Sequence, residues 1–156
     1  MARLARIASL ATLLLAAAAL AACGGDNTEK NRYIDQLTTA QTRFQTTQER
    51  FEADATKSST ARQNRVALTR FAAAIDDTVT ALRRIAAPAQ VAAEHRRFVG
   101  VFVAWHDDVA RFAAAIRKPT PRAFERARRR IAAATVTFNR DSRHAATQID
   151  VKLESI

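Results

Sequence analysis

Cys23 is the residue whose neighbours most clearly prepare it for chemistry. It is the only cysteine among the 156 residues, so no disulfide can form within the chain. Residues 20–22 (Leu-Ala-Ala) precede it and end an apolar run, Ile7–Ala22, that starts after two arginines. A positive start, a short apolar segment and small residues before a cleavage point are typical of a secretory signal peptide. The run is shorter than the about 20 residues that span a hydrocarbon core. We therefore predict a signal peptide over residues 1–22, cleaved before Cys23.

Histidine and carboxylate side chains could hold a metal ion, but their spacing in this chain does not favour one. His106 is followed by Asp107 and Asp108. Consecutive helical residues point about 100° apart, so these three side chains cannot converge on one ion. Asp141 and His144 could share a helix face. Di-iron bundles, however, need Glu-x-x-His on two helices, and the sequence contains no such motif. We predict no metal site.

Catalytic motifs are missing from the sequence. There is no Gly-x-Ser-x-Gly and no glycine-rich phosphate loop, and the adjacent Asp76 and Asp77 diverge on a helix. His95 lies on an apolar stripe, where we expect a hydrogen-bonded residue near one end of the fold. The alternatives for His95 are a metal ligand or a pH sensor. We predict that the protein is not an enzyme and holds no dissociable cofactor.

Apolar residues recur every three or four positions through most of the chain, which predicts amphipathic helices. The clearest stripe runs through His95, Phe98, Phe102, Trp105, Val109, Phe112 and Ile116. Three breaks separate four segments: a polar stretch before a Thr60–Gln63 capping box, Pro88, and a Thr120 cap followed by Pro121. We predict helices over approximately residues 28–56, 60–86, 88–117 and 121–153.

Helices of similar length with short connections favour antiparallel neighbours. The expected fold class is therefore all-α: an up-down-up-down antiparallel four-helix bundle over residues 28–156, joined to the signal peptide by a flexible tether at residues 23–27. Phe44, Phe71, Phe102 and Phe138 each fall near the middle of a segment, which predicts one central layer of rings. Such a layer could line a ligand pocket, but buried phenylalanine more often forms plain core.

The stretch Leu20-Ala21-Ala22-Cys23 resembles the lipobox of bacterial lipoproteins. This resemblance implies that Cys23 carries covalent lipid such as palmitate, becomes the first mature residue and tethers the protein to the outer face of a membrane. Residues 82–99, LRRIAAPAQVAAEHRRFV, resemble a pattern in small Ala- and Arg-rich actinobacterial lipoproteins of uncharacterised function. That second resemblance implies a secreted four-helix domain and supplies no catalytic residues.

The formal net charge is +10, and arginine supplies most of the basic residues. Either GC-rich coding bias or attraction to anionic partners accounts for this excess. The first basic cluster flanks the expected second turn and shares a bundle end with the tether, where it could contact an anionic surface: Arg83, Arg84, Arg96 and Arg97. The second cluster lies at the opposite end: Arg117, Lys118, Arg122, Arg126 and Arg128–Arg130. The alternative for both clusters is a solvated face. Helical spacing also predicts ion pairs between Asp107 and Arg111 and between Glu125 and Arg129.

Together these patterns predict a lipid-anchored protein on the extracytoplasmic face of a cell membrane. Its expected role is a non-catalytic binding or structural module of the cell envelope. The expected partners are the membrane itself and an envelope protein or anionic polymer, and not nucleic acid. The alternative is a small-ligand carrier or sensor that binds an apolar or anionic ligand within the bundle.

Overall fold

The computed structural model describes residues 28–57, 60–116 and 120–155. Four long helices form this part of the chain, α1 (Thr28–Lys57), α2 (Ala61–Arg83), α3 (Ala92–Ala115) and α4 (Pro121–Glu154), and it contains no strand. The prediction of an all-α helical bundle is confirmed. The predicted signal peptide, the Cys23 lipidation site and the tether at residues 23–27 lie outside the described residues.

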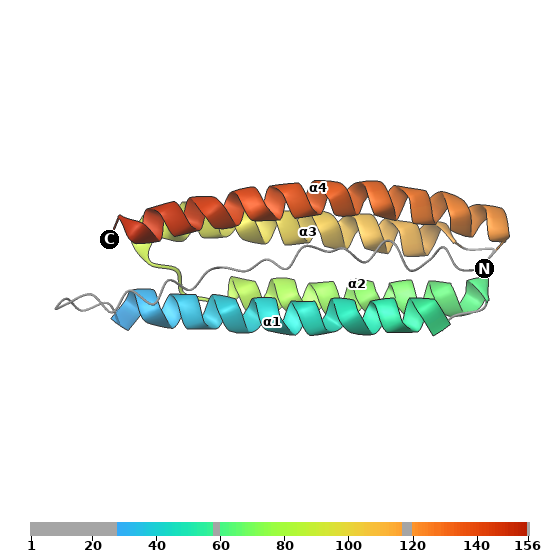
Figure 1. Cartoon of the computed structure of the whole chain (residues 1–156), viewed down its shortest axis with the longest axis horizontal. Helices are drawn as coiled ribbons and strands as arrows, with labels where there is room; N and C mark the ends of the chain where they lie inside the picture. Colours follow the sequence, from blue (N-terminus) through green and yellow to red (C-terminus); the bar gives the residue numbers. More distant parts are fainter. Residues whose placement is uncertain (1–27, 58–59, 117–119, 156) are drawn as a thin grey trace.

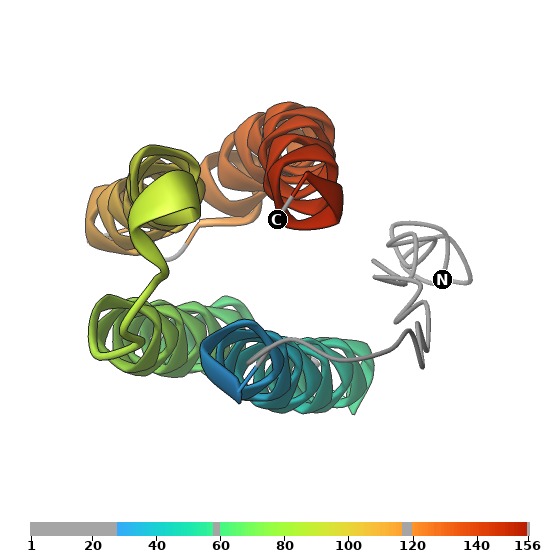
Figure 2. The ribbon, with the colours of Figure 1, turned by 90° about the vertical axis from the view of Figure 1, so that its left-hand side faces the viewer.

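Consecutive helices pack side by side, α1 on α2, α2 on α3 and α3 on α4. In Figure 1 the chain passes back and forth along the long axis, and Figure 2 shows α1 and α2 in one layer facing α3 and α4 in the other. The near end of the bundle, as used below, holds Thr28, the connection 84–91 and Ser155. The far end holds Thr60 and Thr120. None of the helices in the described ranges is long and apolar enough to cross a membrane.

Two threonine caps fix where helices begin at the far end. The Gln63 backbone N–H donates to Thr60 Oγ1 at 3.2 Å, and the Thr60 N–H donates to Gln63 Oε1 at 3.0 Å. This capping box satisfies N–H groups that have no partner within the helix. At α4 the Ala123 N–H donates to Thr120 Oγ1 at 3.2 Å, and Pro121 occupies the first turn. Both predicted caps are confirmed.

The connection between α2 and α3 differs from the prediction. Helix α2 ends at Arg83 rather than near residue 86, and α3 begins at Ala92 rather than at Pro88. A residue before proline is disfavoured in the helical conformation, which keeps Ala87 out of a helix that would continue to Pro88. Pro88 itself is extended, with φ −51° and ψ 146°, and its carbonyl accepts the Val91 N–H at 3.0 Å in a single 3-10 turn.

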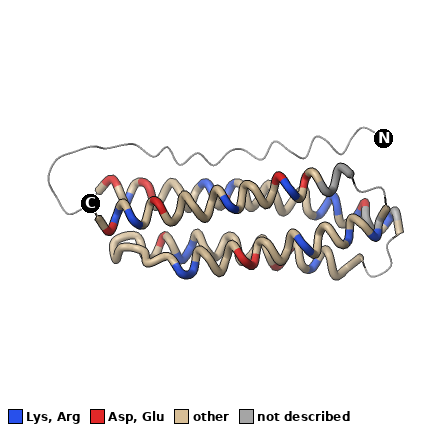
Figure 3. Tube along the Cα trace, turned by 90° about the horizontal axis from the view of Figure 1, so that it is seen from below, with Lys and Arg blue, Asp and Glu red and all other residues tan. Residues whose placement is uncertain are grey.

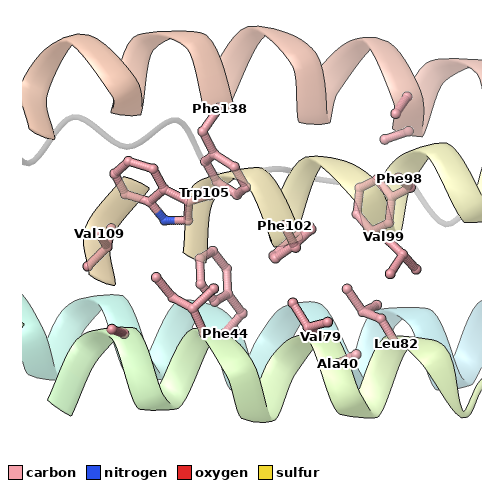
Figure 4. Close-up of a cluster of buried hydrophobic side chains, with 14 of the residues drawn as sticks. Ala40, Phe44, Val79, Leu82, Phe98, Val99, Phe102, Trp105, Val109 and Phe138 are labelled. Atoms are coloured by element: carbon pink, nitrogen blue, oxygen red, sulfur yellow. The ribbon is translucent and has the colours of Figure 1, made fainter. Parts of the chain in front are cut away.

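Three of the four central phenylalanines form the predicted ring layer (Figure 4). The ring centroids of Phe44 and Phe102 are 5.0 Å apart, those of Phe102 and Phe138 5.1 Å, and those of Phe44 and Phe138 5.8 Å. All three rings are buried and meet edge to face, an arrangement that the aromatic quadrupole favours. This layer joins α1, α3 and α4.

The prediction that Phe71 belongs to the same layer is wrong. Phe71 stacks on Phe51 at 4.3 Å and meets the edge of Trp105 at 6.4 Å, and Trp105 in turn stacks on Phe138 at 5.4 Å. The connection 84–91 occupies the near end in place of α2, so α2 is set toward the far end (Figure 1). Its middle residue therefore lies in the next layer.

Candidate functional site

Two polar side chains meet inside the near end. Tyr33 from α1 is fully buried and His95 from α3 is 6% exposed. The Tyr33 hydroxyl lies 3.1 Å from His95 Nδ1, and His95 Nε2 lies 3.0 Å from the Leu82 carbonyl oxygen at the end of α2. Both ring nitrogens of His95 are therefore satisfied by protein groups. The prediction of a hydrogen-bonded histidine near one end is confirmed.

The electrostatic setting keeps both members of this pair neutral. Burial lowers the pKa of His95, against the opposing effect of its bond to Leu82. Burial raises the pKa of Tyr33, and the negative charges of Asp150 and Glu94 raise it further. Burial also raises the pKa of Asp150, with Glu154 acting in the same direction. Through its two ring nitrogens, His95 links α3 to Tyr33 of α1 and to Leu82 of α2.

The four arginines proposed for an anionic surface are all exposed at the near end. Arg83 is the last residue of α2 and Arg84 is its C-cap, while Arg96 and Arg97 lie in the first turns of α3. Of these four arginines, only Arg97 forms an ion pair within the described ranges, a long one of 3.9 Å to Glu94. Acidic and basic positions alternate at this end in Figure 3. We call the four arginines Arg83, Arg84, Arg96 and Arg97 the near-end quartet.

A second group of arginines opens α4 at the far end. The first ten residues of α4, Pro121–Arg130, contain five arginines and one glutamate, whereas the rest of the helix contains three basic and three acidic residues. Most charged positions at the far end are basic (Figure 3). The charge excess of α4 is therefore confined to its start.

The single acid in this stretch neutralises only one arginine. Arg128 donates to Glu125 Oε2 through Nε at 3.1 Å and through Nη2 at 2.9 Å, so the predicted Glu125–Arg129 pair is wrong. Positions three and four residues apart are both neighbours on a helix, and here the closer one is used. Four further arginines are exposed and form no ion pair with a residue that the structure describes: Arg122, Arg126, Arg129 and Arg130. We call them the α4 arginine row.

This row works against the stability of its own helix. Cations are unfavourable at the positive N-terminal end of a helix by roughly 0.3–1 kcal/mol, and Arg122 lies in the first turn of α4, which contains no acidic residue. Like charges four residues apart, as in Arg122–Arg126 and Arg126–Arg130, destabilise a helix by roughly 0.2–0.5 kcal/mol per pair. Local helix energetics therefore do not explain the row.

The remaining candidates from the sequence form local pairs. His106 Nδ1 lies 3.0 Å from Asp107 Oδ1, and Arg111 Nη1 donates to Asp108 Oδ1 at 3.0 Å, so the predicted Asp107–Arg111 pair is wrong. Asp141 accepts a hydrogen bond from its neighbour Arg140 at 2.8 Å. The described residues include no cluster of three or more His, Cys, Asp or Glu side chains that could hold a metal ion.

A shallow groove of about 550 Å³ lies between α2 and α3. Alanines make up half of its lining, Ala72, Ala110, Ala113 and Ala114, and Arg65 and Arg70 also border it. The groove is open and separate from the aromatic layer, which is filled by its own rings. No sequence pattern signalled this groove, because it depends on how three alanines of α3 meet a mixed face of α2.

Comparison with known proteins gives no assignment: no family model, no curated protein and no solved structure matches this chain.

Proposed function

We propose that the protein is a lipid-anchored, extracytoplasmic lipoprotein that acts as a non-catalytic binding or structural module of the cell envelope. The observation that carries this proposal is the single cysteine, Cys23, placed directly after Leu20-Ala21-Ala22 and an apolar run that follows two arginines. Small residues before a cleavage point are common to secretory signals. A cysteine directly after the cleavage point is what distinguishes a lipoprotein signal from other secretory signals.

The position of the helices supports an orientation with the near end toward the membrane. Helix α1 begins at Thr28, five residues after Cys23, and five extended residues reach at most about 18 Å. The near-end quartet lies at the same end. Each basic side chain close to anionic headgroups contributes about 1 kcal/mol to membrane binding, so the quartet would reinforce the lipid anchor.

The packing of the bundle supports a module rather than a carrier that holds a ligand inside. The rings of Phe44, Phe102 and Phe138 contact one another at the centre, and Trp105 stacks against Phe138. A ligand site needs unfilled volume with polar groups directed into it. The back-and-forth course of the chain in Figure 1 supports the finer proposal of an up-down-up-down bundle.

Metabolic labelling tests the anchor. Cells expressing the full chain are grown with a labelled fatty acid, and the protein is isolated from the membrane fraction. We expect label on the wild-type protein and none on Cys23→Ser. Absence of label from the wild type, or label that persists after the substitution, contradicts the proposal.

Vesicle binding tests the orientation. The full chain with Cys23→Ser is compared on anionic and neutral vesicles, and every variant keeps the same N-terminal segment with Arg3 and Arg6, so the contribution of that segment cancels between variants. We expect Gln at all four near-end quartet positions to reduce the preference for anionic vesicles. Gln at the four α4 arginine row positions changes the net charge equally and should leave that preference in place.

A further inference from the structure

The α4 arginine row is a group of four exposed cations that the proposed function does not use. Its four guanidinium groups are exposed and unpaired within the described ranges. Arg122 opposes the helix dipole, and Arg126 repels both Arg122 and Arg130 from four residues away. A feature that breaks local rules without a structural gain marks a functional surface. The geometry points to an interaction surface for a phosphate-bearing anionic polymer along the first three turns of α4.

The spacing of the row fits a chain of anions better than a single small anion. At a rise of 1.5 Å per residue, Arg122 and Arg126 are separated by about 6 Å along the axis, and Arg122 and Arg130 by about 12 Å. A small anion can contact one or two of these groups. A polymer with a charge on every unit can contact all four at once, and each further contact then forms at high effective concentration.

Phosphate is the anion chemistry that we assign, because the planar guanidinium group binds phosphate oxygens through two parallel N–H donors, a geometry that the lysine ammonium group does not reproduce. Carboxylates pair with guanidinium in the same way, so polyglutamate is the competing polymer, and tighter row-dependent binding to it than to polyphosphate would overturn the assignment of phosphate. The row is at the far end, opposite the end that we propose faces the membrane. A flat lipid surface is therefore the less favoured partner. This step rests on the proposed function, because it uses the proposed orientation of the bundle on the membrane.

Arg128 and Glu125 set the limit of this surface. Arg128 is held by two hydrogen bonds to Glu125 Oε2, so it is not available to an anionic ligand. Glu125→Gln removes the carboxylate while leaving the row unchanged. We expect this substitution to tighten polymer binding by releasing a fifth arginine and removing a repulsive charge.

The experiment measures binding of medium-chain inorganic polyphosphate to the full chain with Cys23→Ser in a non-ionic detergent. Two variants have equal net charge: Gln at the four row positions, R122Q/R126Q/R129Q/R130Q, and Gln at the near-end quartet, R83Q/R84Q/R96Q/R97Q. We expect the row variant to bind at least about tenfold more weakly than the parent and the quartet variant to change by less than about twofold. Four phosphate contacts on a single-stranded polymer also predict an about 50-fold loss of wild-type affinity between 50 and 200 mM salt.

Three further arms separate the possible outcomes. Orthophosphate at equal total phosphate should compete poorly, and Lys at the four row positions should restore binding only in part. Equal loss in the two Gln variants would show unspecific charge attraction and overturn the proposal, as would unchanged binding in the row variant. Tighter row-dependent binding to phosphatidylglycerol vesicles than to polyphosphate would assign the row to a membrane surface instead. All eight positions are exposed, so we expect each variant to fold. Trp105 fluorescence and thermal melts check this.

Discussion

The Tyr33 hydroxyl donates a hydrogen bond to His95 Nδ1 across 3.1 Å. The direction follows from the other ring nitrogen: Nε2 lies 3.0 Å from the Leu82 carbonyl oxygen, which can only accept. Burial lowers the pKa of His95 and so favours the neutral ring. In that ring the proton lies on Nε2, and Nδ1 accepts. Through this one ring, α1, α2 and α3 are joined at the near end.

The neutral state of His95 predicts that the protein is less stable in mild acid. Burial lowers the pKa of His95 below its ordinary value of 6.5, so the folded state resists a proton that the unfolded chain accepts. Above pH 6.5 both states are neutral and the full contribution to stability is present, whereas it is lost as the pH falls below that value. Urea unfolding followed by Trp105 fluorescence should show a lower midpoint at about pH 5.5 than at about pH 7.5.

His95→Gln is the control for this prediction, because a glutamine amide does not titrate. Asp150 affects the pH dependence of stability in the opposite direction. Burial raises its pKa, so the folded state favours the protonated form, and lowering the pH increases the contribution of Asp150 to the free energy of unfolding. The difference between wild type and His95→Gln removes that contribution. If the two proteins lose stability in parallel between these pH values, His95 is not the titrating group.

Tyr33→Phe should destabilise the protein by about 1–3 kcal/mol, because His95 Nδ1 is then buried without a donor. The ring itself is kept, so its edge contact with the His95 ring, at 5.5 Å, remains. Urea denaturation at pH 7.5 measures the change. A loss below about 0.5 kcal/mol would mean that water replaces the hydroxyl.

Phe138→Ala should cost about 3–5 kcal/mol of unfolding free energy. Its ring contacts Phe44, Phe102 and Trp105, so its removal opens a cavity at the meeting point of three helices. Val136→Ala, two residues earlier, is a matched control, since Val136 is 70% exposed. That change should stay within about 0.5 kcal/mol, and similar losses at both positions would contradict the described layer.

Gly100→Ala should stabilise the protein by about 0.5–1 kcal/mol. Gly100 lies inside α3 and is exposed, and a Cβ placed there would meet nothing within 4 Å. Alanine reduces the conformational entropy of the unfolded chain and favours the helix. A higher urea midpoint with unchanged denaturant dependence is the expected result. A lower midpoint would show that this face of α3 is closely packed against something in solution.

Much of the fold could be predicted from the sequence because helix signals are local. The three-and-four spacing of Phe98, Phe102 and Trp105 requires only one helix to be meaningful. The Thr60 and Thr120 caps depend on residues within one turn. The same locality explains why His95, a polar residue on an apolar stripe, was recognisable as a hydrogen-bonded position before its partner was known.

The tertiary structure decided everything that depends on how the helices lie along one another. Whether Phe71 lies in the same layer as Phe44 depends on how many residues at the end of α2 belong to the connection 84–91 instead. The spacing of residues within one helix does not reveal that number. The choice of Arg128 over Arg129 as the partner of Glu125 decided which four of the five arginines stay unpaired, and side-chain geometry alone makes that choice. Periodicity fixes which face of each helix is buried, but the register between helices is set by the packing of side chains from different segments.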